Sequence, residues 1–497
     1  MTSLARSRST LCQVSGLVFA ILLSSCGEKV EYFRRINLNG KFQYTGIFPV
    51  NKAEVASNNC YKFTSFGGRL ESIEFLKNGR LSLSDFGFAR LVYEYYENVV
   101  MVSWEDQFAL PMRIENTHTY ERLHITKEGV YDQLDFLDRN FHPVIVDGIR
   151  FVNLESDNKG RRATSWYHGP DGKLTEKEGV YGIKRKFNDE DMIVEQMFLD
   201  RNGNPGSDIR GLTYMRSVFD PSGNHVTLSY LDIDDKPVES LDGVATTRWK
   251  YDKFGNTIET AYYDRFDNIV NGIQGIAFNT FTYDLAGNQI SRAFFDSLMR
   301  PAPFEGFVKF NWFYDKQGFC TRQAFFREKD DSVYLDYSIR FIYDESGNLR
   351  EERRYGSSMK LEEENGIAVR FFGYDGAHNM VSYQTYDAEG YLVPFEKGIA
   401  DIKWSYNISG EKIECRYYDP DGNLKGGKYH EAINRSVYDE CGFLLEQSLY
   451  DSLDQPMNFN GVSRVEFSYD DFGRLVEELK FDKDGTRIES PLFTQSL

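Results

Sequence analysis

Short runs of alternating apolar and polar residues fill most of the chain, and the stretch around Tyr251 shows the pattern clearly. From Val244 to Tyr251, one row of side chains is Ala, Thr, Trp and Tyr, and the intervening row is Val, Thr, Arg and Lys. Because successive side chains of a strand point to opposite faces, this contrast predicts a strand with one buried face. A second run, 257–264, follows the sequence Asp-Lys-Phe-Gly-Asn, where Asp252 can accept hydrogen bonds from the turn backbone and Gly255 can adopt a positive φ. The pattern predicts an antiparallel β-hairpin.

The same pattern recurs along the chain. When Tyr251 is taken as position zero, equivalent positions follow at steps of 29 to 32 residues. There are fourteen of them: Phe63, Tyr93, Ile125, Ser156, Phe187, Phe219, Tyr251, Tyr283, Tyr314, Tyr343, Tyr374, Tyr406, Tyr438 and Tyr469. Twelve of the fourteen are Phe or Tyr, and glycine stands four residues later in eleven, where chance would give about one. The sequence therefore predicts an all-β tandem array of about 14 hairpins of about 31 residues each.

The clearest copies supply the candidate turn residues. These are Asp252, Gly255, Asp284, Gly287, Asp344 and Gly347. Fourteen hairpins contain about 28 strands, which at about 4.8 Å each would make a flat strip more than about 130 Å wide. Open twisted sheets rarely exceed about ten strands without curling. We therefore expect a spiral, a shell or an open solenoid with the aromatic rows inside; a propeller of paired hairpins is the alternative.

The N-terminal residues do not fit the repeat. Two arginines precede an apolar run of about ten residues that ends at Leu23, too short to span a bilayer but suited to a signal peptide. The run leads into Leu-Ser-Ser-Cys, and this order of features resembles the lipobox of bacterial lipoproteins. The resemblance implies a signal peptide and lipid attachment at Cys26. An ordinary signal peptide with an incidental cysteine is the alternative.

Four segments result from these patterns. They are a lipoprotein signal peptide (1–25), a tether and N-terminal cap (26–54), the hairpin array (55–490) and a C-terminal tail (491–497). Two or more acyl chains on Cys26 would anchor the protein stably to a membrane. Because Gly27 stands where an Asp would favour inner-membrane retention, the outer membrane or cell surface is the expected location.

The copies YDKFGN, YDLAGN, YDESGN and FDPSGN resemble the YD repeat of Rhs-type proteins, and in the first two an apolar strand and a second Tyr-Asp or Phe-Asp pair follow. Members of that family form long strips of β-hairpins that curl into shells, and some enclose a C-terminal toxin. The resemblance covers residues 55–490 and implies a β-strip architecture. The period here is longer than the family's usual one, and only a few residues follow the array.

Net charge and cysteine spacing limit the kinds of partner and metal site that the sequence can be expected to have. The net charge is −18, or −20 without residues 1–25, which argues against nucleic acid because nucleic acid calls for a basic face. Cys60, Cys320, Cys415 and Cys441 remain after Cys12 and Cys26 are set aside, and their spacing defines no disulfide framework and no zinc site. The membrane is therefore the expected partner through the lipid, and a protein or a glycan is a candidate ligand.

No recurring catalytic group is visible. The seven histidines occupy different positions of the repeat, and no metalloprotease, nucleophile-elbow or phosphate-loop motif occurs. The Asp-rich turns 419–423 and 482–485 offer oxygens that calcium prefers, but turn geometry also explains them, so we assign no metal and no cofactor. The adjacent rings Tyr262/Tyr263 and Tyr417/Tyr418 would present one ring each for sugar or peptide stacking, unless both faces of the sheet are packed.

These observations predict a lipid-anchored envelope protein that binds or scaffolds through an extended β-repeat surface, and they assign no catalytic residue. Two alternatives stay open. The first is an enzyme or enzyme subunit with a site assembled between repeats, for which a deep pocket joining several acids and a histidine would argue. The second is an Rhs-like shell or carrier remnant without a toxin cargo, for which a hollow interior would argue.

Overall fold

The computed structural model describes residues 27–41, 43–114, 117–240, 242–330, 332–427, 430–440, 442–470 and 475–488. Within these ranges the chain forms one 32-stranded sheet and two short 3₁₀ segments, η1 (Lys52–Ser57) and η2 (Ile273–Gly275). The predicted all-β class and hairpin array are confirmed. The predictions for the signal peptide, Cys26, Cys441 and the tail 491–497 lie outside the described residues.

The strands fall into two groups along the chain. The first group is β1 (Glu28–Leu38), β2 (Tyr44–Pro49), β3 (Cys60–Phe66), β4 (Arg69–Lys77), β5 (Arg80–Leu81), β6 (Arg90–Tyr95), β7 (Val99–Glu105), β8 (Tyr120–Ile125), β9 (Tyr131–Leu137), β10 (Phe151–Ser156) and β11 (Arg162–His168). The second group is β12 (Gly182–Phe187), β13 (Ile193–Leu199), β14 (Tyr214–Phe219), β15 (His225–Leu231), β16 (Thr246–Tyr251), β17 (Thr257–Tyr263), β18 (Phe278–Tyr283), β19 (Gln289–Phe295), β20 (Lys309–Tyr314), β21 (Cys320–Lys329), β22 (Ser332–Tyr343), β23 (Leu349–Gly356), β24 (Val369–Tyr374), β25 (Met380–Tyr386), β26 (Asp401–Tyr406), β27 (Lys412–Tyr418), β28 (Ile433–Tyr438), β29 (Leu444–Tyr450), β30 (Arg464–Tyr469), β31 (Leu475–Phe481) and β32 (Arg487–Ile488).

Neighbouring strands pair antiparallel in chain order from β6 onwards. At the start, β1 lies between β2 and β3, and β4 pairs with β3 along one edge and with β5 and β6 along the other. Residues 28–49, expected to be a tether and cap, thus form a hairpin at the end of the sheet. Within a hairpin such as β16–β17 six residue pairs match, whereas β17 and the next hairpin share only three.

A β-bulge recurs at the same place in the twelve hairpins from β8–β9 to β30–β31. In β16–β17, Lys250 lies opposite Glu259 but Tyr251 lies opposite Thr257, so Ile258 is the extra residue. The other eleven hairpins repeat this shift beside their own position-zero residue. A bulge bends its strand and increases the local twist. Twelve identical bends explain why the strip coils.

Each typical repeat contains three tight turns. The first is the Asp–Gly turn after position zero, where Gly255 has a φ of 81°. At the opposite end of the hairpin, Asp264 accepts backbone hydrogen bonds from Phe266 and Asn268 in a turn of the same form. A third turn follows at Gly272–Ile276, with Gly275 at a φ of 78°. The segment after Asp264 is therefore built from two ordered turns.

Three hairpins depart from this pattern. The β3–β4 hairpin turns through Gly67 and Gly68, both with positive φ, and β6–β7 carries no bulge. In the ninth repeat, β21 continues into β22 as a long hairpin with eight residue pairs, and the second and third turns are missing. That loss explains why the next position zero, Tyr343, follows Tyr314 after only 29 residues.

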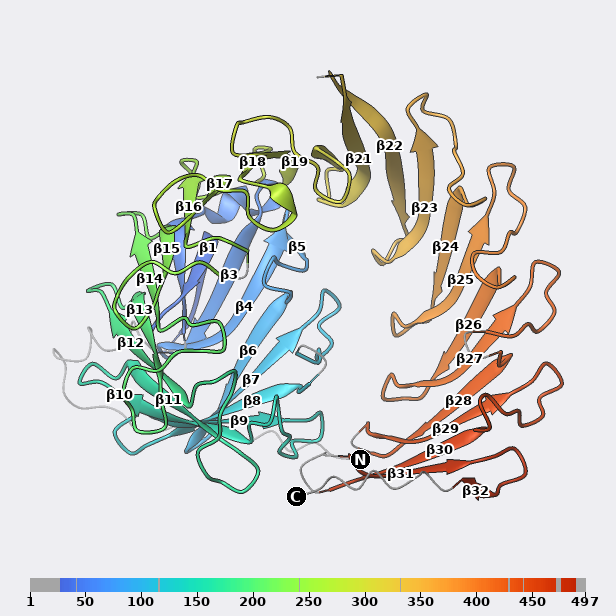
Figure 1. Cartoon of the computed structure of the whole chain (residues 1–497), viewed down its shortest axis with the longest axis horizontal. Coiled ribbons are helices and arrows are strands. Elements are labelled where there is room, and N and C mark those ends of the chain that lie inside the picture. The colour runs from blue at the N-terminus through green and yellow to red at the C-terminus, as the bar shows by residue number, and fades with distance from the viewer. Residues whose placement is uncertain are drawn as a thin grey trace, which may run out of the picture.

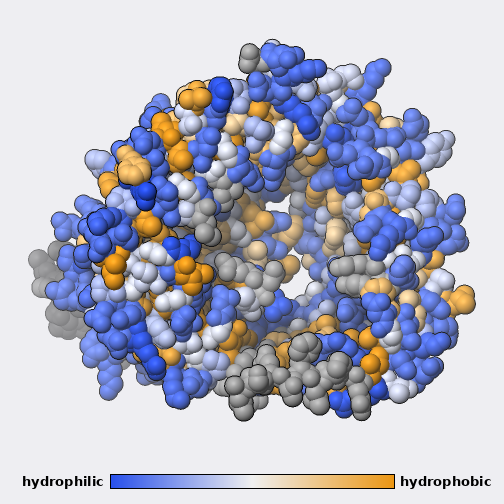
Figure 2. All heavy atoms as spheres, in the orientation of Figure 1, coloured by the Kyte–Doolittle hydropathy of each residue, from blue (hydrophilic) through white to orange (hydrophobic). Residues whose placement is uncertain are grey.

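The sheet coils round a central opening. Figure 1 shows the strip running from β1 to β9, turning at β10 and β11, rising through β12–β17, crossing through β18–β22 and descending through β23–β31. We refer to β1–β9 with their connecting loops as the first layer, and to β12–β31 as the second layer. Figure 2 shows the opening in the space-filling view, with hydrophobic residues exposed along its wall.

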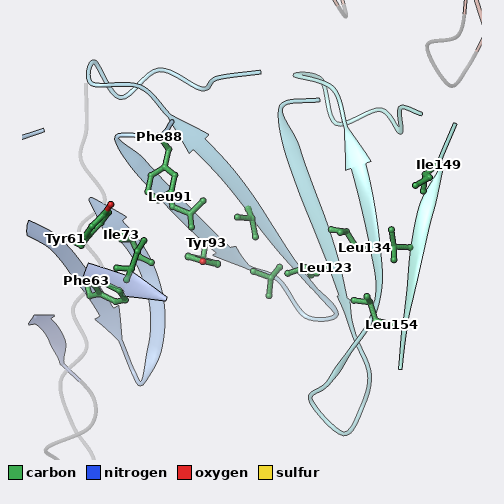
Figure 3. Close-up of a cluster of buried hydrophobic side chains, with 14 residues drawn as sticks. Tyr61, Phe63, Ile73, Phe88, Leu91, Tyr93, Leu123, Leu134, Ile149 and Leu154 are labelled. Atoms are coloured by element: carbon green, nitrogen blue, oxygen red, sulfur yellow. The ribbon is translucent and has the colours of Figure 1, made fainter. Parts of the chain in front are cut away.

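The largest buried cluster lies among the strands from β1 to β10 and their connections. Fourteen buried apolar side chains, among them Ile73, Phe88, Leu91 and Leu154, pack together there (Figure 3). Smaller clusters follow along the array, for example the one around Phe294. The buried side chains therefore form a series of clusters along the sheet instead of one central core, as expected when each repeat packs on its neighbours.

The face opposite the aromatic rows carries paired charges. In the third repeat, Asp135 is 6% exposed and accepts hydrogen bonds from Arg122, His124 and Gln133. Burial alone would raise the pKa of Asp135, but these hydrogen bonds outweigh it and hold the pKa below its ordinary value. The group therefore stabilises the fold above the unfolded pKa of about 3.9. That contribution disappears as the pH falls through the lowered folded pKa.

We expect Asp135→Asn to lower the free energy of unfolding by about 1–3 kcal/mol at pH 7, because Arg122 loses its charged partner. The deficit should begin to shrink as the pH falls below about 4, where the carboxyl of the unfolded wild-type chain binds a proton, and should vanish below the lowered pKa of the folded state. Denaturant unfolding of both proteins from pH 7 to pH 3 measures the effect. Asp234→Asn is the control, because its side chain is 70% exposed. A pH-independent deficit would contradict the ion-pair explanation.

Candidate binding cleft

The six predicted turn residues all lie in hairpin turns. Asp252 Oδ1 accepts hydrogen bonds from the backbone N–H of Phe254 and Asn256, at 2.8 and 2.9 Å, and Gly255 N–H donates to the Asp252 carbonyl. The Asp284 and Asp344 carboxylates each accept two hydrogen bonds from the asparagine four residues later, one from its backbone and one from its side chain. Asp therefore closes the turn, and Gly supplies its left-handed residue; Gly287 and Gly347 have φ values of 92° and 90°.

The Asp–Gly turns of the second layer also meet the first layer, and we refer to this row of contacts as the seam. His378, which replaces the turn glycine in the eleventh repeat, stacks on Phe108 with ring centroids 3.7 Å apart. Hydrogen bonds join the layers at seven further points: Gly40 with Asp191, Asn37 with Gly223, Arg35 with Gly255, Asn59 with Ala286, Asn78 with Lys316, Arg139 with Ser409, and Asn140 with Glu440. Successive repeats thus contact successive parts of the first layer, and the seam closes the coil.

Two adjoining cavities lie along the seam, and we refer to them together as the seam cleft. One, of about 390 Å³, is lined by Arg34, Arg35, Tyr61, Phe75, Asp85 and Tyr283 among others. The other, of about 450 Å³, is lined by Arg80, Gln107, Phe319, Gln323, Phe341 and Tyr343 among others. Lys77, Trp312 and Tyr314 line both. Each volume lies in the range of about 300–1,000 Å³ that is typical of ligand sites.

The electrostatics of the seam cleft differ from those of the whole chain. Acids outnumber bases by 76 to 58 in the sequence, yet four cations and a single acid, Asp85, line the two cavities. Burial lowers the pKa of Arg80 and raises that of Tyr343 to about 12. Neutral phenols and charged guanidinium groups therefore coexist there at physiological pH, and the wall is positive and aromatic.

A smaller cavity of about 330 Å³ lies between the sixth, seventh and eighth repeats. Arg292 lies in its wall, within 5.4 Å of the Phe281, Phe294 and Phe304 ring centroids, and donates two hydrogen bonds to Asn279. Tyr262 also lines this cavity. Its neighbour Tyr263 packs under Arg248 on the opposite face, at 4.1 Å, so both rings of this predicted pair are packed.

Five cavities in the described residues can be compared with the pocket of several acids and a histidine that would argue for an enzyme. Of the five clearest cavities in the described part of the chain, none combines a histidine with more than one acid. Glu363, Asp387 and Glu389 form an acidic group at the surface. In the Asp-rich turn 419–423, the Asp419 carboxylate accepts two backbone hydrogen bonds, as in the other turns.

Three of the cysteines that remained after the signal segment are described, and each is a free thiol. Cys60 and Cys415 are buried, and Cys320 is half-buried. Burial raises the pKa of Cys60 to about 11, and it raises the pKa of the other two. Because the thiolate is the reactive form, these groups are poor nucleophiles at neutral pH. They contribute apolar volume rather than chemistry.

The cleft residues Arg34, Lys77 and Gln107 were not predicted from the sequence. Arg34 comes from β1 in the cap, Lys77 from the end of β4 and Gln107 from the loop after β7, where the repeat pattern is weak or absent. The one sequence feature that could have pointed to the cleft is the pair of adjacent arginines at 34–35, within the stretch Tyr-Phe-Arg-Arg. Their partners lie more than 200 residues away, as in the 220-residue separation between Arg35 and Gly255.

Fold and cleft define a β-hairpin repeat protein coiled into an open shell. No protein-family model matches the chain, and no curated protein matches its sequence. Among solved structures, the chain is similar to that of TcdB2-TccC3-TEV, with 11% identity, a TM-score of 0.39 and coverage of 92% of this chain and 24% of that one. For TcdB2-TccC3-Cdc42 the identity is 10%, the TM-score 0.27 and the coverage 91% and 28%. The chain thus spans about a quarter of their length, and scores this low support no conclusion about function.

No helix among the described residues has the length and apolar composition needed to cross a bilayer.

Proposed function

We propose that this protein is a lipid-anchored component of a bacterial cell envelope that acts as a binding scaffold through its coiled sheet. The seam cleft is the observation that carries the binding role, because it joins residues from both layers into two adjoining cavities with one electrostatic character. A rigid, extended array can present such a cleft at a fixed distance from its anchor. The YD-type repeat resemblance supports the scaffold role, since that family builds β-strip shells.

The proposed anchor is a set of acyl chains on Cys26. Each buried CH₂ group contributes about 0.8 kcal/mol, so two or more chains hold a protein stably in one leaflet. The first strand begins at Glu28, only two residues after this cysteine, so the coil would stand close to the membrane surface. Gly27 in place of an Asp favours the outer membrane or cell surface.

Metabolic labelling with an alkyne-tagged palmitate tests the anchor. We expect the wild-type protein to carry the label and to sediment with the outer-membrane fraction, and Cys26→Ser to lose the label. Cys12→Ser is the matched control, because that cysteine lies within the proposed signal peptide and its loss should leave labelling unchanged. An unlabelled, freely soluble wild-type protein would overturn the anchoring proposal.

A carrier shell is the second candidate, and the central opening favours it (Figure 2). A shell of this kind would protect a guest polypeptide from protease while folded and would release it on unfolding. Mass spectrometry of the purified protein before and after limited proteolysis distinguishes the two roles. A protected guest of defined sequence supports the carrier, and an empty coil supports the scaffold.

A further inference from the structure

The four cations of the seam cleft have no carboxylate partner within ion-pair distance among the described residues. Arg34 donates to the side-chain oxygen of Asn58, and Arg35 donates to the carbonyl of Gly255, each at 2.7 Å. Lys77 lies 6.0 Å from the Tyr314 ring centroid, and Arg80 lies 3.5 Å from that of Phe319. Cations elsewhere in this acid-rich chain are commonly paired, as Arg216 is with Glu195 at 2.7 Å. The cleft thus holds four cations without direct ion pairs, and Asp85 in the first cavity and Asp315 near Arg80 act on them only at longer range.

Two buried acceptors in the cleft also lack a partner. The side-chain oxygens of Asn59 and Gln107 are inaccessible to solvent and accept no hydrogen bond within the described structure. Asn59 lines the first cavity and Gln107 the second. A buried acceptor without a donor costs about 1–3 kcal/mol, so rotation of either amide towards its cavity would let a ligand hydroxyl satisfy it.

The aromatic side chains of the cleft indicate what kind of ligand ring could pack there. Trp312 and Tyr314 line both cavities, and their side chains are half-buried. Flat aromatic faces beside hydrogen-bonding groups suit a ring that is apolar on its faces and polar at its edge. A pyranose ring has this character, with C–H groups on its faces and hydroxyls round its edge. Two cavities that share this wall suit a short chain of such rings better than one small ion.

We propose that the seam cleft binds an acidic oligosaccharide, with its acid groups on Arg34, Lys77 and Arg80 and its sugar rings on Trp312 and Tyr314. The hydroxyl groups donate to the side-chain oxygens of Asn59 and Gln107, whose amides rotate towards the cavities on binding. This inference deepens the proposed binding role and rests on it. Single-stranded nucleic acid offers rings and anions too, but its continuous line of phosphates is opposed by a chain with a net charge of −18.

Isothermal titration calorimetry on the purified full-length protein tests the inference with four probes. The probes are tetragalacturonate, its methyl ester, tripolyphosphate and a short oligothymidylate. We expect tetragalacturonate to bind at least tenfold more tightly than its ester, which lacks the charge, and than tripolyphosphate, which lacks the rings. Added salt should weaken the binding of tetragalacturonate and leave that of the ester unchanged.

Three variants assign the contacts. Lys77→Gln should weaken tetragalacturonate about tenfold and leave the ester unchanged, whereas Trp312→Leu should weaken both sugars and leave tripolyphosphate unchanged. Gln107→Leu should weaken both sugars by removing an acceptor. Lys250→Gln is the matched control, because Lys250 is exposed and pairs with Glu259 outside the cleft. Unchanged thermal midpoints show that each variant remains folded.

The outcomes separate the inference from the proposed function. Equal affinity for the acid and its ester, no binding of either sugar, or tighter binding of oligothymidylate would each overturn the acidic-oligosaccharide inference. If the protein carries the lipid label but gives any of these binding results, the anchoring proposal stands and the acidic-oligosaccharide inference fails. If the protein carries no lipid label but binds tetragalacturonate with the expected variant pattern, the acidic-oligosaccharide inference stands and the anchoring proposal fails.

Discussion

Replacing Phe294 by Ala is expected to lower the free energy of unfolding of the central repeats by about 3–5 kcal/mol. The Phe294 side chain is 0% exposed, and its ring lies 4.9 Å from that of Phe304 and 5.4 Å from that of Phe310. Truncation removes apolar contacts among β19, β20 and the connection that carries Phe304, and it leaves a void beside the small cavity of Arg292. The surrounding sheet is held by hydrogen bonds and cannot collapse to fill that void.

The effect should be local, because each repeat contacts chiefly its neighbours. Amide hydrogen exchange should show faster opening in β17–β20 and little change in β3–β7. Phe266→Ala is the matched control, since Phe266 is 70% exposed at the tip of a turn, and surface substitutions usually stay within about 0.5 kcal/mol. Uniformly faster exchange along the whole chain would show that the coil unfolds as one unit.

Replacing Gly255 by Ala is expected to cost about 2–5 kcal/mol of unfolding free energy and to loosen the seam. The φ of 81° alone costs an L-residue about 1–2 kcal/mol. The new Cβ would also lie 2.5 Å from the Phe48 ring and 2.9 Å from Arg35 Cδ, so both side chains must move. Overpacking of this kind typically costs a further 1–3 kcal/mol or so. Denaturant unfolding measures the total.

Gly287→Ala provides the comparison, because the same turn position has a φ of 92° but its Cβ would meet nothing closer than 3.8 Å. Only the backbone cost of about 1–2 kcal/mol should appear there. The difference between the two variants therefore isolates the seam contact. Equal losses of unfolding free energy in the two variants would mean that the Gly255 turn does not pack against the first layer in solution.

The repeat could be predicted from the sequence because its signal is local. Position zero, the Asp–Gly turn and the returning strand all lie within about twelve residues, and turn chemistry fixes their geometry. The bulge at Ile258 has no such signal, since any residue can occupy it. The second turn at Asp264 repeats the chemistry of the first, but its left-handed residue is Asp267 rather than glycine, which obscures the pattern.

The seam cleft could not be predicted from the sequence, since its residues come from the N-terminal part (34–107) and from the middle (256–347) of the chain. Lys77 and Trp312 are 235 positions apart, and only the pitch of the coil brings them together. That pitch results from twelve small bends and from the long hairpin β21–β22, whose combined angle a residue pattern does not encode. The predicted aromatic rows are nevertheless the surface on which the cleft is built.

The seam has a consequence for how the molecule folds. Individual hairpins need only nearby residues and can form early, but the contact between Asn140 and Glu440 must bridge 300 residues. A chain that emerges N-terminus first would complete β1–β9 before most of its docking partners exist. The early strands would then serve as a template onto which each later repeat docks in chain order. Ring closure would be the last and slowest event, and an unclosed crescent the kinetic intermediate.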